Sequence, residues 1–177
     1  MTARQIVLPG VEDTQALGRA LGALLRAGDL VVLTGGLGAG KTTLTQGLGD
    51  GLGVRGPVTS PTFVIARVHP SLVGGPVLVH VDAYRLSSAA ELDDLDLDAD
   101  LDASVVIVEW GAGLAEQLSD TRLELTISGD LERTVHAVAD FIEDGIRLVR
   151  QRRCLREVAV RDEGPFGQVA RKDAREP

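Results

Sequence analysis

The sequence predicts an α/β fold with a mixed, mostly parallel sheet that is flanked by helices and has antiparallel strands at its edges. An apolar run at 30–34 (LVVLT) leads through a glycine-rich turn into a predicted helix at 41–52. Short unbroken apolar runs, of which 104–109 (SVVIVE) is another, are typical of strands that are covered on both faces. Segments 122–128 and 134–138 are predicted to pair antiparallel at the edge of the sheet.

A helix is predicted before the first of these strands. It begins at Asp13 or Thr14, either of which can cap it, and it runs to about Ala27. Its apolar positions recur at helical spacing and are Leu17, Leu21, Leu24 and Leu25.

After the helix at 41–52 the chain alternates between turns and strands. The loop 56–63 (GPVTSPTF) contains two prolines and leads into a predicted strand at 63–68. The turn at 69–76 separates this strand from the next one, at 77–81.

Two later segments have a less regular pattern. The segment 111–118 (GAGLAEQL) is the next predicted helix. The run 91–103 (ELDDLDLDADLDA) carries seven acidic residues, and a solvated surface is its ordinary meaning. A docking patch for a partner protein is the sharper alternative.

Length and composition limit the class of protein. We expect residues 1–150 to form one domain and residues 151–177, which mix charge, Gly and Pro without periodicity, to begin a helix and then form a flexible tail.

The formal net charge of −8 argues against direct, strong nucleic-acid binding, which normally needs a basic face. The single cysteine, Cys154, excludes an intrachain disulfide. No apolar run approaches the roughly 20 residues of a membrane span and no secretory signal is visible, so we expect a cytoplasmic protein.

The glycine-rich turn carries the clearest functional motif. The segment GGLGAGKT matches G-x-x-x-x-G-K-[ST] at Gly35, Gly40, Lys41 and Thr42, between a predicted strand and a predicted helix. Its backbone N–H groups and the start of the helix would bind phosphate, Lys41 would reach the β- and γ-phosphates, and Thr42 would offer its hydroxyl to Mg²⁺. A glycine-rich turn that matches by chance is the alternative, but it would not be expected in this setting. The sequence therefore predicts a P-loop NTPase fold.

Two carboxylates each follow an apolar run. Asp82 ends VLVHVD and Glu109 ends SVVIVE, so both should emerge at the sheet edge where the phosphate loop lies. P-loop enzymes need an acidic residue there to hold Mg²⁺ or to orient the attacking water. Either Asp82 or Glu109 could do so, and capping of the following turn is the structural alternative.

Hydroxyl, histidine and aromatic residues surround these positions. Thr59, Ser60 and Thr62 could sense the γ-phosphate, although a turn stabilised by a proline also explains them. His80 and Tyr84 alternate with Asp82 and could share its face, with a structural role equally open for His80. Trp110 follows Glu109 and is expected at the rim of the site, with packing as the alternative.

In this order, GGLGAGKTTL, SPTF, HVDAYRL followed by EL, and IVEWGAG resemble the TsaE family, the bacterial ATPases of tRNA threonylcarbamoyladenosine synthesis. The resemblance covers about residues 5–140. It implies a P-loop fold with a mixed sheet, ATP and Mg²⁺ as ligands, weak intrinsic hydrolysis, and action together with the TsaB and TsaD proteins.

The resemblance also implies roles for particular residues. It places the metal ligands on Thr42 and Glu109 and the switch acid on Asp82, and it places the adenine near the first helix entry and an arginine of a late strand. The residues expected to bind nucleotide are Val11, Thr14, Gly35, Gly38, Ala39, Gly40, Lys41, Thr42, Thr43, Thr62, Asp82, Trp110 and Arg133.

The predicted function is hydrolysis of the β–γ bond of ATP by water, in which Lys41 and Mg²⁺ neutralise developing charge and Asp82 or Glu109 orients the water. Asp82 is expected to bind the metal together with Thr42 and Glu109. A small-molecule kinase is one alternative, but segment 111–135 offers only two arginines for a lid. A GTPase-type switch is another, but the sequence contains no N-K-x-D or T-K-x-D segment to bind guanine.

Overall fold

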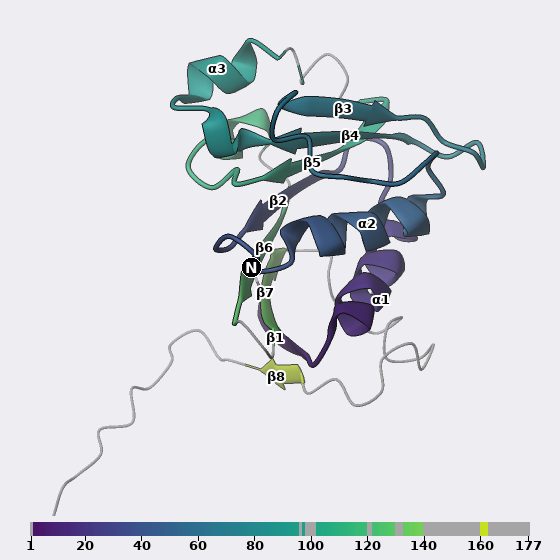
Figure 1. Cartoon of the computed structure of the whole chain (residues 1–177), viewed down its shortest axis with the longest axis vertical. Helices are drawn as coiled ribbons and strands as arrows, with labels where there is room; N and C mark the ends of the chain where they lie inside the picture. The colour runs from purple at the N-terminus through teal and green to yellow at the C-terminus, as the bar shows by residue number, and fades with distance from the viewer. Residues whose placement is uncertain are drawn as a thin grey trace, which may run out of the picture.

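The computed structural model describes residues 2–95, 97, 102–119, 122–129, 133–139 and 160–162. Within these ranges the strands form one sheet in the order β3-β4-β5-β2-β6-β7-β1-β8 (Figure 1). The strands are β1 (Thr2–Leu8), β2 (Leu30–Thr34), β3 (Ala66–His69), β4 (Val77–Asp82), β5 (Ser104–Glu109), β6 (Arg122–Ser128), β7 (Arg133–Ala139) and β8 (Val160–Asp162). The neighbours β4, β5, β2 and β6 run parallel, and the outer pairings are antiparallel.

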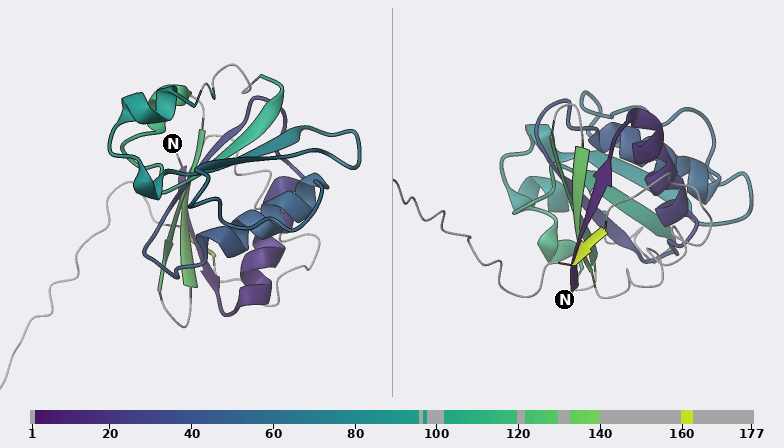
Figure 2. Two further views of the ribbon diagram at one scale, coloured as in Figure 1. Left: turned by 45° about the horizontal axis from the view of Figure 1, so that its top comes forward. Right: turned by 90° about the horizontal axis from the view of Figure 1, so that it is seen from below.

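Helices cover both faces of the sheet. The helical elements are α1 (Val11–Gly22), α2 (Lys41–Leu52), α3 (Ala89–Asp93) and the short 3₁₀ turns η1 (Ala83–Arg85) and η2 (Glu116–Leu118). The pair α1 and α2 lies side by side on one face, as the views in Figures 1 and 2 agree. None of the described helices is both long and apolar enough to span a bilayer.

Alternating strand residues divide the core into two layers. On the face of α1 and α2, Leu33 and Ile107 pack with Leu17 and Leu48 in one buried cluster. On the opposite face, strand residues such as Val106 join a second cluster with Leu92 and Leu97 of the acidic run. The described part of the acidic run is therefore not solvated throughout, because Leu92 and Leu97 are buried in this cluster.

The predicted fold class is confirmed, and so are several elements. The strand at 30–34 and the helix at 41–52 have the predicted bounds, and the strand at 104–109 does too. The strand predicted at 77–81 extends by one residue, to Asp82.

Other element predictions need correction. The first helix begins at Val11, not at Asp13 or Thr14, because Gly10 is its extended N-cap, and Thr14 donates its backbone and side-chain hydrogens to the Gly10 carbonyl. It ends at Gly22 rather than near Ala27. After this end, the backbone N–H groups of Leu24 and Leu25 both donate to the Leu21 carbonyl.

The loop predictions were wrong at two further places. The strand predicted at 63–68 begins only at Ala66, since Ile65 has a left-handed backbone with φ of 67°. The segment 111–118 is not a helix, because Gly113 is also left-handed, with φ of 81°, and only η2 forms.

The predicted antiparallel pair of β6 and β7 exists, but it is not the edge of the sheet. β6 lies beside β2, and β1, which the sequence analysis did not predict, extends the sheet beyond β7. Of the predicted tail, the structure describes only β8, which pairs with β1. The predicted helix start near 151, Cys154 and the rest of 151–177 lie outside the described residues.

The helices α1 and α2 pack with their backbones in direct contact. A Cβ added to Gly18 of α1 would lie 2.5 Å from the carbonyl oxygen of Leu44 in α2. Gly22, Gly47 and Gly51 also face backbone atoms of the other helix. Glycine is thus required because a side chain would separate the helices, although glycine lowers helix propensity.

We predict that Gly18→Ala destabilises the chain by about 1–3 kcal/mol. Overpacking against a backbone carbonyl that no rotamer change can relieve outweighs the gain of about 1 kcal/mol in helix propensity. Urea unfolding at unchanged m-value measures this loss. Gly75→Ala is the matched control, because its new Cβ would have only ordinary contacts, the nearest at 3.6 Å from Ser71 Oγ. Equal stability of the two variants would contradict the prediction.

Candidate functional site

The loop between β2 and α2 presents the helix N-terminus to solvent. Gly40, the N-cap of α2, has a left-handed backbone with φ of 104°, which residues with a side chain rarely adopt. In the described part of the chain, no side-chain hydrogen bond caps the start of α2. The first N–H groups of the helix therefore remain directed at the space above the loop, which is the arrangement that binds phosphate groups.

Lys41 is the cation of this loop. It is only 5% exposed, and its Nζ donates to the carbonyl oxygens of Gly35 and Gly36, both at 2.9 Å. Burial lowers the pKa of the Lys41 ammonium below its ordinary value, and the nearby carboxylates of Glu109 and Asp82 act in the opposite direction. The loop thus holds a buried lysine close to two carboxylates.

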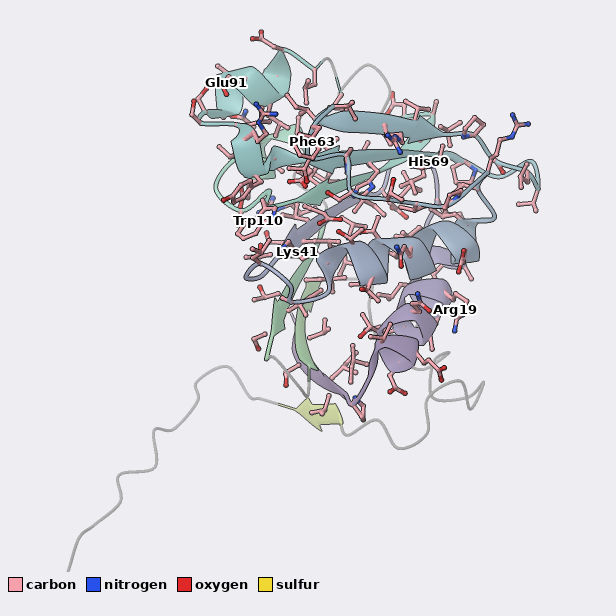
Figure 3. The ribbon with its side chains drawn as sticks, viewed as in Figure 1. Arg19, Lys41, Phe63, His69, Glu91 and Trp110 are labelled. Carbon is pink, nitrogen blue, oxygen red and sulfur yellow. The ribbon has the colours of Figure 1, made fainter. Side chains whose placement is uncertain are left out.

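Trp110 covers this lysine. Lys41 Nζ lies 3.8 Å from the ring centroid of Trp110, within cation–π range, and Figure 3 labels both residues. The ring centroid of Tyr84 lies 5.1 Å from that of Trp110. The Trp110 backbone is left-handed, with φ of 61°, and its N–H donates to the carbonyl of Leu33. Such a conformation costs about 1–3 kcal/mol and is typical of functional sites. Here it turns the chain at the end of β5 so that the indole faces the loop.

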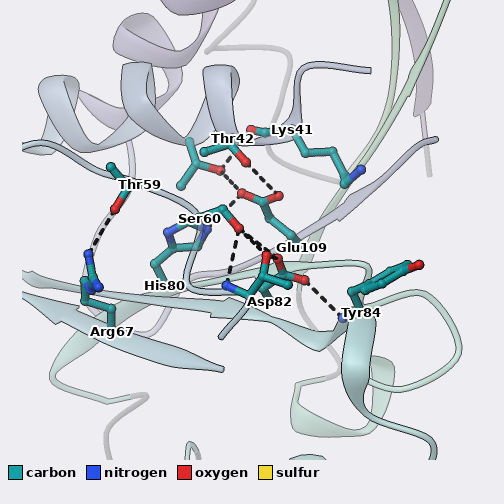
Figure 4. Close-up of polar contacts among 11 residues, drawn as sticks. Lys41, Thr42, Thr59, Ser60, Arg67, His80, Asp82, Tyr84 and Glu109 are labelled. Carbon is teal, nitrogen blue, oxygen red and sulfur yellow. Dashed lines mark hydrogen bonds and ion pairs between the residues drawn. The ribbon is translucent and has the colours of Figure 1, made fainter. Parts of the chain in front are cut away.

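Glu109 is a buried carboxylate that ties three elements together. It is 2% exposed, and its Oε2 accepts a hydrogen bond from Thr42 Oγ1 at 3.1 Å (Figure 4). Its Oε1 lies 2.9 Å from His80 Nε2 and 3.4 Å from Thr45 Oγ1. The carboxylate of β5 is therefore held by α2 on one side and by β4 on the other.

Asp82 lies directly beside it. The parallel register pairs Asp82 with Glu109 across β4 and β5, but Asp82 has different partners. Its Oδ2 accepts hydrogen bonds from the hydroxyls of Ser60 and Thr62, and its Oδ1 accepts one from the backbone N–H of Tyr84 (Figure 4). Asp82 thus anchors the loop that follows α2, as Glu109 anchors α2 itself.

These groups line one pocket of about 480 Å³. Its lining, as far as the described residues go, consists of Leu37, Gly38, Gly40, Lys41, Thr42, Thr43, Ser60, Thr62, Asp82, Tyr84, Glu109 and Trp110. The structure therefore brings the predicted loop, both carboxylates, Thr62 and the tryptophan together. Of the remaining loop residues, Ala39 packs in the core and Gly35 lies against the backbone of Ile127.

The residues predicted to lie near the adenine are not among those that line this pocket. Val11 is half exposed at the start of α1, and Thr14 is fully buried. Arg133 begins β7 opposite Leu8, and its side chain is outside the described part of the structure. Leu8 closely precedes α1, so the backbones of Val11 and Arg133 lie near the same end of β1. Their roles stay predictions.

The sequence analysis missed Thr45 and Leu37. Thr45 follows Thr42 by three residues, so both project from one face of α2 toward Glu109. That spacing was a usable signal. Leu37 carried none, because it is an apolar loop residue that is 94% exposed.

The residues present fit a magnesium ion held jointly with phosphate groups. Mg²⁺ is usually bound in such sites by one or two carboxylates and phosphate oxygens, with several waters. The Thr42 hydroxyl and the Glu109 carboxylate are in contact at 3.1 Å, and Asp82 is on the adjacent strand. Within the described ranges no cluster of three or more His, Cys, Asp or Glu side chains could hold a metal without such a ligand.

The strand β2, the glycine loop and the helix α2, at the carboxyl ends of the central parallel strands, have the arrangement of a P-loop NTPase fold. A family model described as "Threonylcarbamoyl adenosine biosynthesis protein TsaE" matches residues 8–135. The chain belongs to the TsaE family.

Individual relatives agree with this assignment. A tRNA threonylcarbamoyladenosine biosynthesis protein TsaE from Streptomyces coelicolor is 66% identical over 127 residues, which cover 71% of this chain and 83% of the relative. The protein of the same description from Bacillus subtilis is 40% identical over 127 residues, covering 70% and 78%. The crystal structure of Bacillus subtilis YdiB is similar with a TM-score of 0.67 at 31% identity, covering 86% of this chain and 97% of that one.

We predict that Thr62→Val destabilises the chain by about 1.5–3 kcal/mol, the usual range for a hydrogen bond to a charged group. The substitution keeps the side-chain shape but removes a donor from Asp82, which is 2% exposed. Chemical denaturation at constant m-value measures the change. Thr59→Val is the matched control on the same loop, because the Thr59 hydroxyl bonds only the exposed Arg67 among the described residues. A loss no larger than the control's would show that Asp82 does not depend on this hydroxyl.

Proposed function

We propose that the chain binds ATP with Mg²⁺ and hydrolyses it to ADP and phosphate in support of tRNA N6-threonylcarbamoyladenosine synthesis. The observation that carries this proposal is the convergence of Lys41, Thr42, Asp82 and Glu109 on one pocket above a phosphate-loop helix. Membership of the TsaE family supports the pathway. Because that pathway acts on tRNA, we propose a cytoplasmic location.

Thr42 and Glu109 would hold the magnesium ion. Bound there, Mg²⁺ would neutralise negative charge on the β- and γ-phosphates. The Thr42 hydroxyl already donates its hydrogen to Glu109 Oε2. Its oxygen can offer a lone pair to the ion while this hydrogen bond is kept. Binding of the ion would therefore not require Thr42 and Glu109 to break the hydrogen bond between them.

Lys41 would bind the phosphates directly. Its ammonium is now satisfied by two backbone carbonyls and faces the Trp110 ring. Phosphate oxygens are stronger acceptors for a charged donor than neutral carbonyls are. We therefore propose that Lys41 exchanges these carbonyls for phosphate oxygens when the substrate enters.

Asp82 is the better placed of the two acids to orient water. Glu109 is committed to Thr42 and His80, whereas Asp82 is bonded to hydroxyls of a loop that itself lines the pocket. In the proposed reaction a water oxygen forms a bond to the γ-phosphorus as the bond to the β–γ bridging oxygen breaks. Asp82 accepts a hydrogen bond from that water and orients it.

The proposed partners are the TsaB and TsaD proteins. Among the described residues that line the pocket, Lys41 is the only cationic side chain, and no arginine reaches it. An arginine that stabilises transition-state charge is worth several orders of magnitude in rate in related phosphoryl-transfer enzymes. We therefore propose slow turnover by the isolated chain and faster turnover in complex with these partners.

We predict saturable binding of Mg-ATP, at least tenfold tighter than that of Mg-GTP, by titration calorimetry. Lys41→Ala should weaken ATP binding tenfold or more, because it removes the only cation of the pocket lining among the described residues. Arg19→Ala is the control, since it removes a positive charge from an exposed position on α1. Undetectable binding of ATP by the wild-type chain would overturn the proposed function, and preference for GTP would favour a guanine-dependent switch.

Substitutions of Asp82 and of Glu109 are predicted to have different effects on binding and turnover. Asp82→Asn should lower ATP turnover by about 10²-fold or more while Mg-ATP affinity changes less than threefold, as expected for loss of a water-orienting group. Glu109→Gln should instead weaken the Mg²⁺-dependent part of ATP binding. Turnover is measured alone and with TsaB and TsaD, and Glu91→Gln serves as an exposed control. Fast turnover by the isolated wild-type chain, or equal effects of the two substitutions, would contradict these assignments.

A further inference from the structure

His80 is a fully buried side chain that the proposed reaction does not use. It projects from β4 on the same side as Asp82, and its relative exposure is 0%. Its Nε2 lies 2.9 Å from Glu109 Oε1 (Figure 4). Its Nδ1 is also buried and, within the described part of the chain, has no hydrogen-bond partner.

This geometry selects one tautomer of the ring. A carboxylate oxygen can only accept, so the 2.9 Å contact requires the hydrogen on His80 Nε2. With the hydrogen on Nδ1, two acceptors would face each other at Nε2 while a buried donor remained unpaired at Nδ1. An unpaired buried donor costs about 1–3 kcal/mol. The ring therefore donates to Glu109 from Nε2.

Glu109 Oε1 depends on this donor. Its other neighbour, Thr45 Oγ1, is 3.4 Å away, and its single hydrogen is shared with the Lys41 carbonyl, which is closer at 3.0 Å. His80 is thus the only strong donor to Oε1 among the described residues. With Oε1 fixed by β4, the second oxygen, Oε2, is held facing Thr42.

We infer that His80 is a positioning residue that holds Glu109 in the orientation needed for the magnesium ion. The inference rests on the proposed function, because it concerns the same ion. Groups that donate to a metal-ligating side chain fix its direction, and their loss typically lowers metal affinity about 10- to 100-fold. The nitrogen that matters is Nε2, and this makes the inference testable by substitution.

Substitution of His80 by Gln or by Asn tests the two ring nitrogens one at a time. The amide nitrogen of Gln occupies about the position of imidazole Nε2, whereas that of Asn occupies the position of Nδ1. We therefore compare His80→Gln, His80→Asn and His80→Leu. His69→Leu is the control, because His69 is a second buried imidazole, on β3, that does not contact Glu109 in the described structure.

The first readout is the ratio of the ATP affinity measured with Mg²⁺ to the ATP affinity measured with EDTA, both by calorimetry. The melting temperature of each variant is recorded as well. We expect a ratio within threefold of wild type for His80→Gln and His69→Leu, and a loss of tenfold or more for His80→Asn and His80→Leu. An unchanged ratio in His80→Asn, or equal losses in His80→Gln and His80→Asn, would overturn the inference. If His80→Leu fails to fold, the comparison of the two amides decides.

The second readout needs no nucleotide. Nitrogen-15 NMR of the imidazole rings, with His80 assigned by comparison with His80→Gln, should show a protonated Nε2 and an unprotonated Nδ1. The reverse pattern would overturn the inference whatever the binding data show. Absence of ATP binding in the wild-type chain would overturn the proposed function instead, so the two failures are distinguishable.

Discussion

Glu109 is a carboxylate buried at the end of the central strand β5, where only 2% of its surface is exposed to water. Withdrawing a carboxylate from water costs several kcal/mol unless donors replace the water. The donors come from α2 and β4, which lie on either side of it. Because both elements must be in place before the charge is satisfied, the site is part of the packed core. The positions of α2, β4 and β5 are fixed by this polar contact as well as by apolar burial.

Local signals predicted the elements around the site well. The strand at 30–34 and the helix at 41–52 could be located because an apolar run, glycines and a helix start follow one another within a few residues. The order of strands could not be read in the same way. That β1 lies outside β7 depends on pairing residues more than 100 positions apart, such as Leu8 with Arg133. The backbone conformations of Ile65 and Gly113 were equally hidden, and they displaced the predicted strand and helix.

The candidate site divides along similar lines. Lys41, Thr42, Asp82 and Glu109 could be predicted because each ends a strand or begins a helix, and sheet topology brings such positions to one edge. The hydrogen bonds among them could not. Nothing in the sequence distinguishes a Thr62 that bonds Asp82 from one that only stabilises a turn, or a His80 that donates to Glu109 from one that packs. Those distinctions depend on side-chain positions that are set only when the strands and the loop pack together.

The glycine contact between α1 and α2 has a mechanical consequence. In most helix pairs, side chains at the interface change rotamer and absorb small displacements of one helix against the other. Here the backbones touch at Gly18, so there is no such compliant layer between them. We therefore expect the two helices to move together, so that the start of α1 follows a movement of the phosphate loop. A spectroscopic label on the exposed side of α1 would consequently report on that loop without touching it.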